Sequence, residues 1–295
     1  MTREINSDTR LSGVIANPIK HSLSPIIHNI GFEEYGINSV YLALETKEED
    51  IDAVFQSIKH LNMLGANVSM PYKNQAFKQM DALTPIARLT ESVNTIKVEN
   101  GMLIGDNTDG VGFVRSLKEE GIDISGKKVA VLGAGGAAKA IICQMALEGV
   151  ESVFVFKRYN QTFQPVVTYF DKISEELNVP ILVYPYEEQE TMRQIIPICD
   201  ILVNGTQVGM GQESHATPIS VQTLPISKEH VLVDLIYYPS ETLFLRQGKH
   251  KGCQTINGLG MLIHQASAAF NWWTGYDLPI ERVKMAIEKE RIKRG

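Results

Sequence analysis

The sequence predicts an α/β protein of two domains, and three observations support this prediction. Strand-like and helix-like segments alternate along nearly all of the 295 residues. A polar connector without apolar periodicity, Asp123–Lys128, divides that alternation into two blocks. The second block opens with an apolar strand that runs into a glycine-rich turn, "VAVLGAGGAAKAII" (Val129–Ile142). We therefore expect one domain over residues 1–122, a second over 123–257, and two helical segments within 258–295.

In the first block, apolar spacing and capping residues indicate each element. Leu11–Ala16 is expected to be a strand. A helix should follow, with Ser24 as its N-cap, Pro25 at its first position and Gly36 at its C-terminal end. The other expected strands are 39–45, 64–70 and a hairpin over 92–107, and the other expected helices are 48–61, 72–80 and 109–121. Because strands and helices alternate, the sheet should be mainly parallel.

The second block contains five strand candidates separated by helices or loops. They cover residues 129–133, 152–157, 181–185, 200–206 and 231–237. Strands that alternate with helices predict a doubly wound parallel sheet. Two helices, 259–275 and 279–294, are expected to close the chain.

Composition excludes several classes of protein. The net charge is -6 and no basic stripe is present, which argues against nucleic-acid binding. No apolar run reaches the roughly 18 residues that a membrane-spanning helix needs. The three cysteines show neither metal-site nor disulfide spacing, and the first ten residues lack the apolar core of a signal peptide. We expect a cytoplasmic protein with no metal, membrane or nucleic-acid partner.

The glycine-rich turn indicates a cofactor. "GAGGAA" (133–138) fits the pattern G-x-G-x-x-G/A between a strand and a helix, which is the fingerprint of a Rossmann-type dinucleotide-binding domain. Its first glycine permits a tight turn, and its second lets backbone approach a pyrophosphate at the helix N-terminus. The next strand ends in Lys157-Arg158 without an acid, so charge favours NADP over NAD. A solvated surface pair is the alternative for these two cations.

Polar side chains gather at strand ends in the first block. Ser22 and Ser24 stand at a strand-to-helix junction, where a capping role is favoured for Ser24. Asn67 and Ser69 lie two apart on a strand and share a face, and Asn94 lies in an otherwise apolar strand, where its amide needs a partner. Two charged residues follow such strands: Lys73, just past Pro71, and Asp109, for which a simple N-cap is the alternative.

Six motifs in order make the chain recognisable. They are "NPIKHSLSP", "GANVSMPYK", "SVNTI", "GDNTDG", "GAGGAA" and "GLGMLIHQA". Together they resemble the shikimate dehydrogenase family from about Gly13 to the C-terminal helices. "HSLSP", "VSMP", "NGTQVGM" and "TGYDLPIERVK" look closest to its quinate/shikimate dehydrogenase branch. The resemblance implies a reversible reduction of 3-dehydroshikimate to shikimate with a nicotinamide cofactor, in aromatic amino-acid biosynthesis.

The family's catalytic pair maps onto Lys73 and Asp109. Hydride transfer to a ketone develops negative charge on oxygen, and an adjacent ammonium group can donate a proton as that happens. Asp109 is then expected to orient Lys73 and to bind a substrate hydroxyl. A catalytically silent sensor of a dinucleotide or hydroxy acid is the alternative from another class, but a sensor has no use for a proton donor. A dehydrogenase of similar two-domain plan for another polyol or a folate-like substrate is the other alternative.

The resemblance also implies the binding residues. Ser22 and Ser24 would hold the substrate carboxylate, and Ser69 stands where many relatives carry threonine. The expected contacts to ring hydroxyls are Asn67, Asn94 and Gln265, with Tyr237 closing the pocket. The expected cofactor contacts are Ala134, Gly135, Gly136, Ala137, Lys157, Arg158, Asn160, Gly205, Thr206 and Gly258. Because Gln265 must reach the substrate, the C-terminal helices 258–295 should complete the first domain.

The choice of cofactor stays open between NAD and NADP. Shikimate-specific relatives commonly carry Asn-Arg-Thr at the strand tip, and the quinate/shikimate branch usually carries Asn-Arg-Arg-Asp. This chain has Lys157-Arg158-Tyr159-Asn160, which matches neither. The branch resemblance favours NAD and the charges favour NADP. Quinate as a substrate and a homodimeric state are likewise left open.

Overall fold

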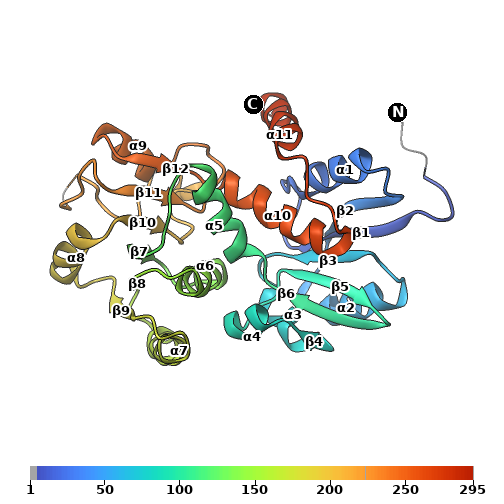
Figure 1. Cartoon of the computed structure of the whole chain (residues 1–295), viewed down its shortest axis with the longest axis horizontal. Coiled ribbons are helices and arrows are strands. Elements are labelled where there is room, and N and C mark those ends of the chain that lie inside the picture. The colour runs from blue at the N-terminus through green and yellow to red at the C-terminus, as the bar shows by residue number, and fades with distance from the viewer. Residues whose placement is uncertain (1–4, 223, 295) are drawn as a thin grey trace. The chain divides into compact units, whose positions relative to one another are not determined.

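The computed structural model describes residues 5–222 and 224–294 and divides into two compact units (Figure 1). Unit 1 comprises residues 1–112 and 263–295, and unit 2 comprises residues 113–262. The boundaries fall inside helices α5 (Asp109–Glu119) and α10 (Leu259–Thr274). The polar connector Asp123–Lys128 therefore lies within unit 2.

The sheet of unit 1 has six strands in the order β2-β1-β3-β5-β6-β4. Their bounds are β1 Arg10–Ala16, β2 Ser39–Glu45, β3 Gly65–Val68, β4 Ala82–Leu83, β5 Thr95–Glu99 and β6 Met102–Asp106. β1 pairs in parallel with β2 and β3, whereas β5 runs antiparallel to both β3 and β6. The reversal from β5 to β6 comes from the expected turn, where Asn100 and Gly101 both have positive φ. The sheet is therefore mixed but still mainly parallel, because β1–β2, β1–β3 and β4–β6 are parallel pairs.

Helices of unit 1 follow the expected pattern, with one correction. They are α1 Ser24–Glu34, α2 Ile51–His60, α3 Lys73–Gln79, α4 Pro85–Thr90, the first turn of α5, most of α10, and α11 Ile280–Arg294. Ser24 is not the N-cap of α1. That position is Leu23, which has helical φ and ψ and no side-chain capping bond, so Ser24 is the first helical residue. The α4 helix and strand β4 were not expected from the sequence, because both are very short.

The C-terminal helices pack on unit 1. Trp273 of α10 donates a hydrogen bond from Nε1 to the Ile96 carbonyl oxygen on β5, at 3.0 Å. A methyl group at Gly31 of α1 would meet Leu278 and Phe270 at less than 3 Å, so glycine permits this close approach. The core below the sheet is formed by apolar residues such as Ile15, Phe55, Ala66, Ile96 and Leu103. This packing fixes the strands that carry the polar residues described below.

Unit 2 is a doubly wound parallel sheet in the order β12-β11-β10-β7-β8-β9. Its strands are β7 Lys128–Leu132, β8 Ser152–Lys157, β9 Ile181–Pro185, β10 Ile201–Asn204, β11 Val231–Asp234 and β12 Gln254–Ile256, and its helices include α6 Gly136–Leu147, α7 Phe163–Leu177, α8 Gln189–Ile195 and α9 Leu243–His250. β12 was not expected. β11 ends three residues earlier than expected because the side chain of Asp234 takes the backbone N–H of Ile236.

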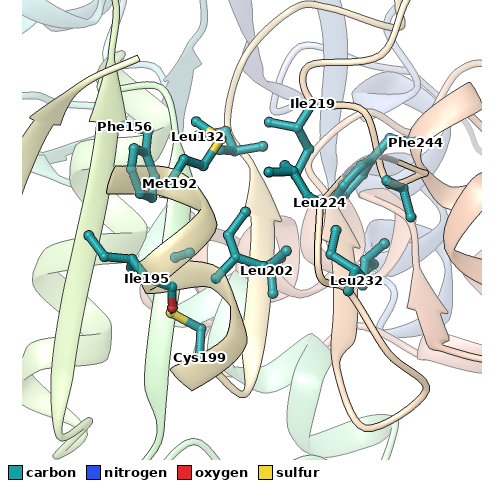
Figure 2. Packing of buried hydrophobic residues seen from close by; sticks show 14 of the residues in the cluster. Leu132, Phe156, Met192, Ile195, Cys199, Leu202, Ile219, Leu224, Leu232 and Phe244 are labelled. Atoms are coloured by element: carbon teal, nitrogen blue, oxygen red, sulfur yellow. The ribbon is translucent and has the colours of Figure 1, made fainter. Parts of the chain in front are cut away.

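A large apolar cluster lies in the core of unit 2 (Figure 2). Leu132 of β7, Phe156 of β8, Leu202 of β10 and Leu232 of β11 meet side chains of the flanking helices. Among these are Met192 and Ile195 of α8 and Phe244 of α9. Strands covered in this way must be apolar, which explains their near-continuous hydrophobic sequences. Among the described residues, no helix is both long and apolar enough to span a membrane.

Candidate active site

An ion pair lies at one edge of the sheet of unit 1. Lys73 is the first residue of α3, which follows β3, and Asp109 is the first residue of α5, which follows β6. The Lys73 Nζ atom lies 2.5 Å from Asp109 Oδ2, and both side chains are largely shielded from solvent, with 16% and 8% exposed. The expected catalytic pair is therefore in direct contact. The Asp109 carboxylate takes part in this pair rather than capping its helix.

The second oxygen of Asp109 is also bound. Asn94 Nδ2 donates to Asp109 Oδ1 at 2.7 Å, and the Asp109 backbone N–H donates to Asn107 Oδ1 at 3.1 Å. Asn94 in turn accepts the Thr108 backbone N–H at 2.8 Å. Each carboxylate oxygen thus has a donor, which holds the group in one orientation. The partner that Asn94 was expected to need is Asp109.

Asn67 occupies the neighbouring strand. It pairs with Thr95 across the antiparallel β3–β5 ladder, and its Nδ2 donates to Thr95 Oγ1 at 3.1 Å. The Tyr41 hydroxyl donates to Asn67 Oδ1 at 2.7 Å. Gln265 of α10 lies beside this group, with Oε1 3.5 Å from Thr108 Oγ1. Asn94 contacts Asp109 directly, Asn67 joins it through Thr95 and the Asn94 backbone, and Gln265 joins it through Thr108.

The three predicted serines differ in how they are connected to Asn67. Ser24 is buried and hydrogen-bonds Tyr41, which links it to Asn67. Ser22 precedes α1, and its hydroxyl accepts the Ser24 backbone N–H at 3.2 Å. Ser69 is half-buried at the end of β3, where its backbone N–H binds the Ile15 carbonyl oxygen.

Tyr41 is buried against a second aromatic ring. Its ring stacks on His28 with centroids 4.3 Å apart, and neither side chain is exposed to solvent. Burial raises the pKa of Tyr41 well above its usual range, so the hydroxyl stays a donor. Burial also lowers the pKa of His28 to about 3. Both ring nitrogens of His28 lack a partner in hydrogen-bond geometry, although the Asn67 amide is near enough to oppose part of that shift.

The glycine turn of unit 2 has the expected conformation. Gly133 has φ +99°, and a methyl group there would lie 3.0 Å from Thr206 Cγ2 and 3.1 Å from the Gly205 carbonyl oxygen. Only glycine fits such a position. Gly135 and Gly136 stand at the start of α6, and a methyl group on either would meet open space. Ala134 and Ala137 flank them, so the backbone at this helix N-terminus is accessible to a phosphate.

A second loop lies next to that turn, beyond β10. Its Gly205 packs against Ala138 and the Leu132 carbonyl oxygen, where a methyl group would be crowded at 3.0 to 3.1 Å. Thr206 donates from Oγ1 to Asn204 Oδ1 at 2.7 Å. Because β7 and β10 are neighbours at which the strand order reverses, this is the position where doubly wound sheets bind ligands. The predicted cofactor residues of both loops therefore lie together.

Asp234 holds this loop through a hydrogen bond from Asn204. It is fully buried at the end of β11, where Asn204 donates to Oδ1 at 3.1 Å and Thr242 donates to Oδ2 at 2.7 Å. Burial raises its pKa, and the hydrogen bonds oppose that shift. Tyr237 follows β11 and is half-buried, and Gly258 packs against the Leu235 carbonyl oxygen, where no side chain fits.

The end of β8 carries the residues expected to choose between cofactors. Lys157 is buried, and its Nζ donates to Asn160 Oδ1 at 2.8 Å. Burial and the neighbouring Arg158 both lower the pKa of Lys157. Arg158 is exposed and forms no ion pair among the described residues. The backbone N–H of Tyr159 donates to the carboxylate of Glu187, which comes from the end of β9.

Several residues of these sites were not predicted from the sequence. Thr95, Tyr41 and His28 lie in or beside the polar network, and Asp234 and Glu187 belong to unit 2. A polar residue inside a buried strand was the available signal for Thr95 and Asp234. Nothing local pointed to Glu187, because its partner lies on another strand. In the described part of the chain, no group of three or more His, Cys, Asp or Glu residues could hold a metal ion.

Comparison with known proteins identifies the family. Residues 14–96 match the shikimate dehydrogenase substrate binding domain, and residues 258–288 match the shikimate 5'-dehydrogenase C-terminal domain. The shikimate dehydrogenase (NADP(+)) of Streptococcus sanguinis is 41% identical over 97% of this chain and 98% of its own length.

Solved structures agree. The shikimate 5-dehydrogenase of Listeria monocytogenes, in complex with shikimate and NAD, has a TM-score of 0.91 and 38% identity over 97% of this chain and 99% of that one. A quinate dehydrogenase of Corynebacterium glutamicum in complex with NAD has a TM-score of 0.84 and 25% identity over 95% and 99% of the two chains. With its fold, its ion pair and its glycine turn in place, this chain belongs to the shikimate dehydrogenase family.

Proposed function

We propose that this protein is a shikimate dehydrogenase that interconverts 3-dehydroshikimate and shikimate by hydride transfer with a nicotinamide cofactor. The observation that carries this proposal is the Lys73–Asp109 contact at 2.5 Å, set among side-chain amides in the substrate domain. Amides and hydroxyls recognise a polyhydroxylated ring, and an ammonium group beside a carboxylate can move a proton. Family membership supports the same reaction.

Lys73 acts as the proton donor in reduction. As hydride adds to the carbonyl carbon, the carbonyl π electrons move to oxygen, and the ammonium group donates one proton to that oxygen. Lys73 is left as a neutral amine, which regains a proton from solvent. In the oxidative direction the neutral amine accepts the hydroxyl proton. Asp109 holds Nζ in place throughout, because its other oxygen is bound to Asn94.

The remaining polar residues of unit 1 bind the substrate in this proposal. Asn67 and Gln265 contact ring hydroxyls, and Asn94 contributes through its hold on Asp109. Ser22 precedes α1 and Ser24 is its first residue, and both bind the carboxylate, aided by the positive end of that helix. Ser69 supplies a further hydroxyl at the end of β3.

The second unit fits a dinucleotide. Open space above Gly135 and Gly136, the tight turn at Gly133 and the start of a helix of 12 residues suit a pyrophosphate. When bound, the nicotinamide cofactor supplies or accepts the hydride. Ala134, Ala137 and the Gly205-Thr206 loop line the same approach, and Gly258 keeps the adjoining backbone close.

We propose NADP as the preferred cofactor. Arg158 is an exposed cation at the end of β8 with no ion-pair partner among the described residues, so it is available to a 2′-phosphate. Lys157 serves instead to fix the strand tip through Asn160. Replacing Arg158 with alanine should lower kcat/KM for NADP about tenfold through loss of a charge-assisted contact, and should leave NAD nearly unaffected. Equal losses with both cofactors would contradict this preference.

A four-way assay tests the proposed reaction. Shikimate or quinate is combined with NAD or NADP, and nicotinamide absorbance is followed. We expect turnover of shikimate, fastest with NADP, and the quinate arms then define how broad the specificity is. Dinucleotide binding by folded protein without turnover in any arm would contradict the proposal and favour a sensor.

A further inference from the structure

Thr95 lies between the two side-chain amides of the pocket. It is fully buried at the start of β5, and its Oγ1 atom is 3.1 Å from Asn67 Nδ2 and 2.8 Å from Asn94 Oδ1. No other described hydroxyl bridges these two amides within 3.1 Å on both sides. Its role therefore depends on which way each amide faces.

Backbone groups settle both orientations. The Thr108 backbone N–H can only donate, so the Asn94 atom 2.8 Å away must be its oxygen. The Asn94 carbonyl can only accept, so the Asn67 atom 3.2 Å away must be its nitrogen. The oxygen of Asn67 then faces Tyr41, whose hydroxyl must donate. These assignments do not depend on the choice between amide oxygen and nitrogen in either side chain.

The hydrogen of Thr95 is thereby assigned. Because Asn67 presents an N–H to it, Oγ1 accepts on that side, and its single hydrogen goes to the Asn94 oxygen at the shorter distance. Only a hydroxyl can accept from one amide and donate to the other in this way. Valine has the same shape but can do neither.

These hydrogen bonds determine which donors and acceptors of each amide remain for a ligand. Asn94 uses its two N–H hydrogens on Asp109 and Thr108, and its oxygen has several donors. Asn67 uses both N–H hydrogens within the protein, whereas its oxygen has two lone pairs and accepts one hydrogen bond, from Tyr41. Asn67 can therefore receive a hydrogen bond from a ligand hydroxyl but cannot donate one.

We propose that Thr95 is a positioning residue that fixes Asn67 as the acceptor of a substrate hydroxyl and couples it to the Asn94–Asp109 contact. This inference rests on the proposed function for the identity of the substrate. It makes the pocket selective for a ring hydroxyl that donates, and it links substrate recognition to the orientation of the carboxylate that holds Lys73.

Thr95→Val and Thr95→Ser distinguish the contribution of the hydroxyl group from that of the side-chain shape. With shikimate, Thr95→Val should lower kcat/KM about tenfold or more, with part of the loss in KM, because two buried hydrogen bonds are lost. Thr95→Ser keeps the hydroxyl and should stay within about threefold of wild type. Ser12→Ala removes another fully buried hydroxyl of the same sheet, bound to the Val40 carbonyl, and should leave both constants unchanged. In an Asn67→Ala background, the KM effect of Thr95→Val should shrink.

A second measurement does not need turnover. Side-chain amide hydrogens of Asn67 and Asn94 should exchange slowly with solvent in wild type and Thr95→Ser, and faster in Thr95→Val, as followed by NMR. Wild-type kinetics in Thr95→Val, equal losses in the valine and serine variants, or fast exchange in wild type would each overturn the inference. Absence of shikimate turnover by the wild type would overturn the proposed function alone, because the exchange rates would still decide the role of Thr95.

Discussion

The two units build their sites from different parts of the chain. In unit 1 the chemistry is carried by side chains, with Lys73, Asp109 and the surrounding amides joined by hydrogen bonds of 2.5 to 3.2 Å. In unit 2 the turn after β7 presents backbone groups to a ligand. Its glycines are needed because they carry no side chain. The first site should therefore be sensitive to hydrogen-bonding type, and the second to volume and backbone conformation.

Asp109→Asn should give the largest effect among the predictions that test this comparison. An asparagine has one acceptor oxygen where the carboxylate has two, so Lys73 and Asn94 would compete for it. We expect kcat for shikimate to fall about a hundredfold, with little change in cofactor affinity. Steady-state kinetics and cofactor titration provide the measurement. Unchanged kcat would show that the carboxylate is not needed for proton transfer.

Two glycines of the same turn should respond differently to one added methyl group. Gly133→Ala places a side chain at φ +99° against Thr206 and should cost about 1–3 kcal/mol in the free energy of unfolding. Gly135→Ala meets open space, so stability should be unchanged while KM for the cofactor rises about tenfold, or about 1.4 kcal/mol. Chemical denaturation and kinetics on both variants check this. The reverse pattern would contradict a backbone-built phosphate site.

His28 should make unit 1 sensitive to acid. Its pKa is about 3 in the fold against 6.5 ordinarily, because burial disfavours the charged ring. The unfolded chain therefore binds a proton first, and stability should be lost as pH falls from 6.5, by up to about 1.4 kcal/mol for each pH unit. His28→Phe keeps an aromatic ring against Tyr41 and should flatten this slope. An equally steep slope in the variant would rule out His28 as its source.

Asp234 in unit 2 should change the pH dependence of stability in the opposite direction to His28, and by less. Burial raises its pKa above 3.8, so the fold favours the neutral acid, and stability declines as pH rises through the raised pKa. Three hydrogen-bond donors oppose that shift, which keeps the effect small. Unfolding of wild type and Asp234→Asn at several pH values above 4 measures it. We expect a flatter dependence in the variant; a steeper one would reverse the assigned sign.

Whether a feature could be predicted from the sequence depended on how far apart its residues lie along the chain. The strand-turn-helix around Gly133 is local, and so are the strand ends that precede Lys73 and Asp109; these were accessible from spacing alone. The network through Thr95 and Tyr41 joins residues 26 to 28 positions apart, which no local pattern reports. Ser24 was assigned to a cap by residue type, but the helical conformation of Leu23 moved the start of the helix. The β5–β6 hairpin follows from a turn that the sequence predicts, whereas the antiparallel pairing of β5 with β3 joins strands far apart in the chain.

Lys73→Ala removes the proposed proton donor. The side chain pairs with Asp109 within unit 1, and the predicted cofactor-binding loops belong to unit 2, so folding and cofactor binding should persist without it. With shikimate and cofactor both shown to bind, we expect kcat to fall about a thousandfold or more, as for loss of a general acid–base. Turnover within a few fold of wild type, from a variant that binds both ligands, would contradict the assignment of Lys73 as the group that moves the proton.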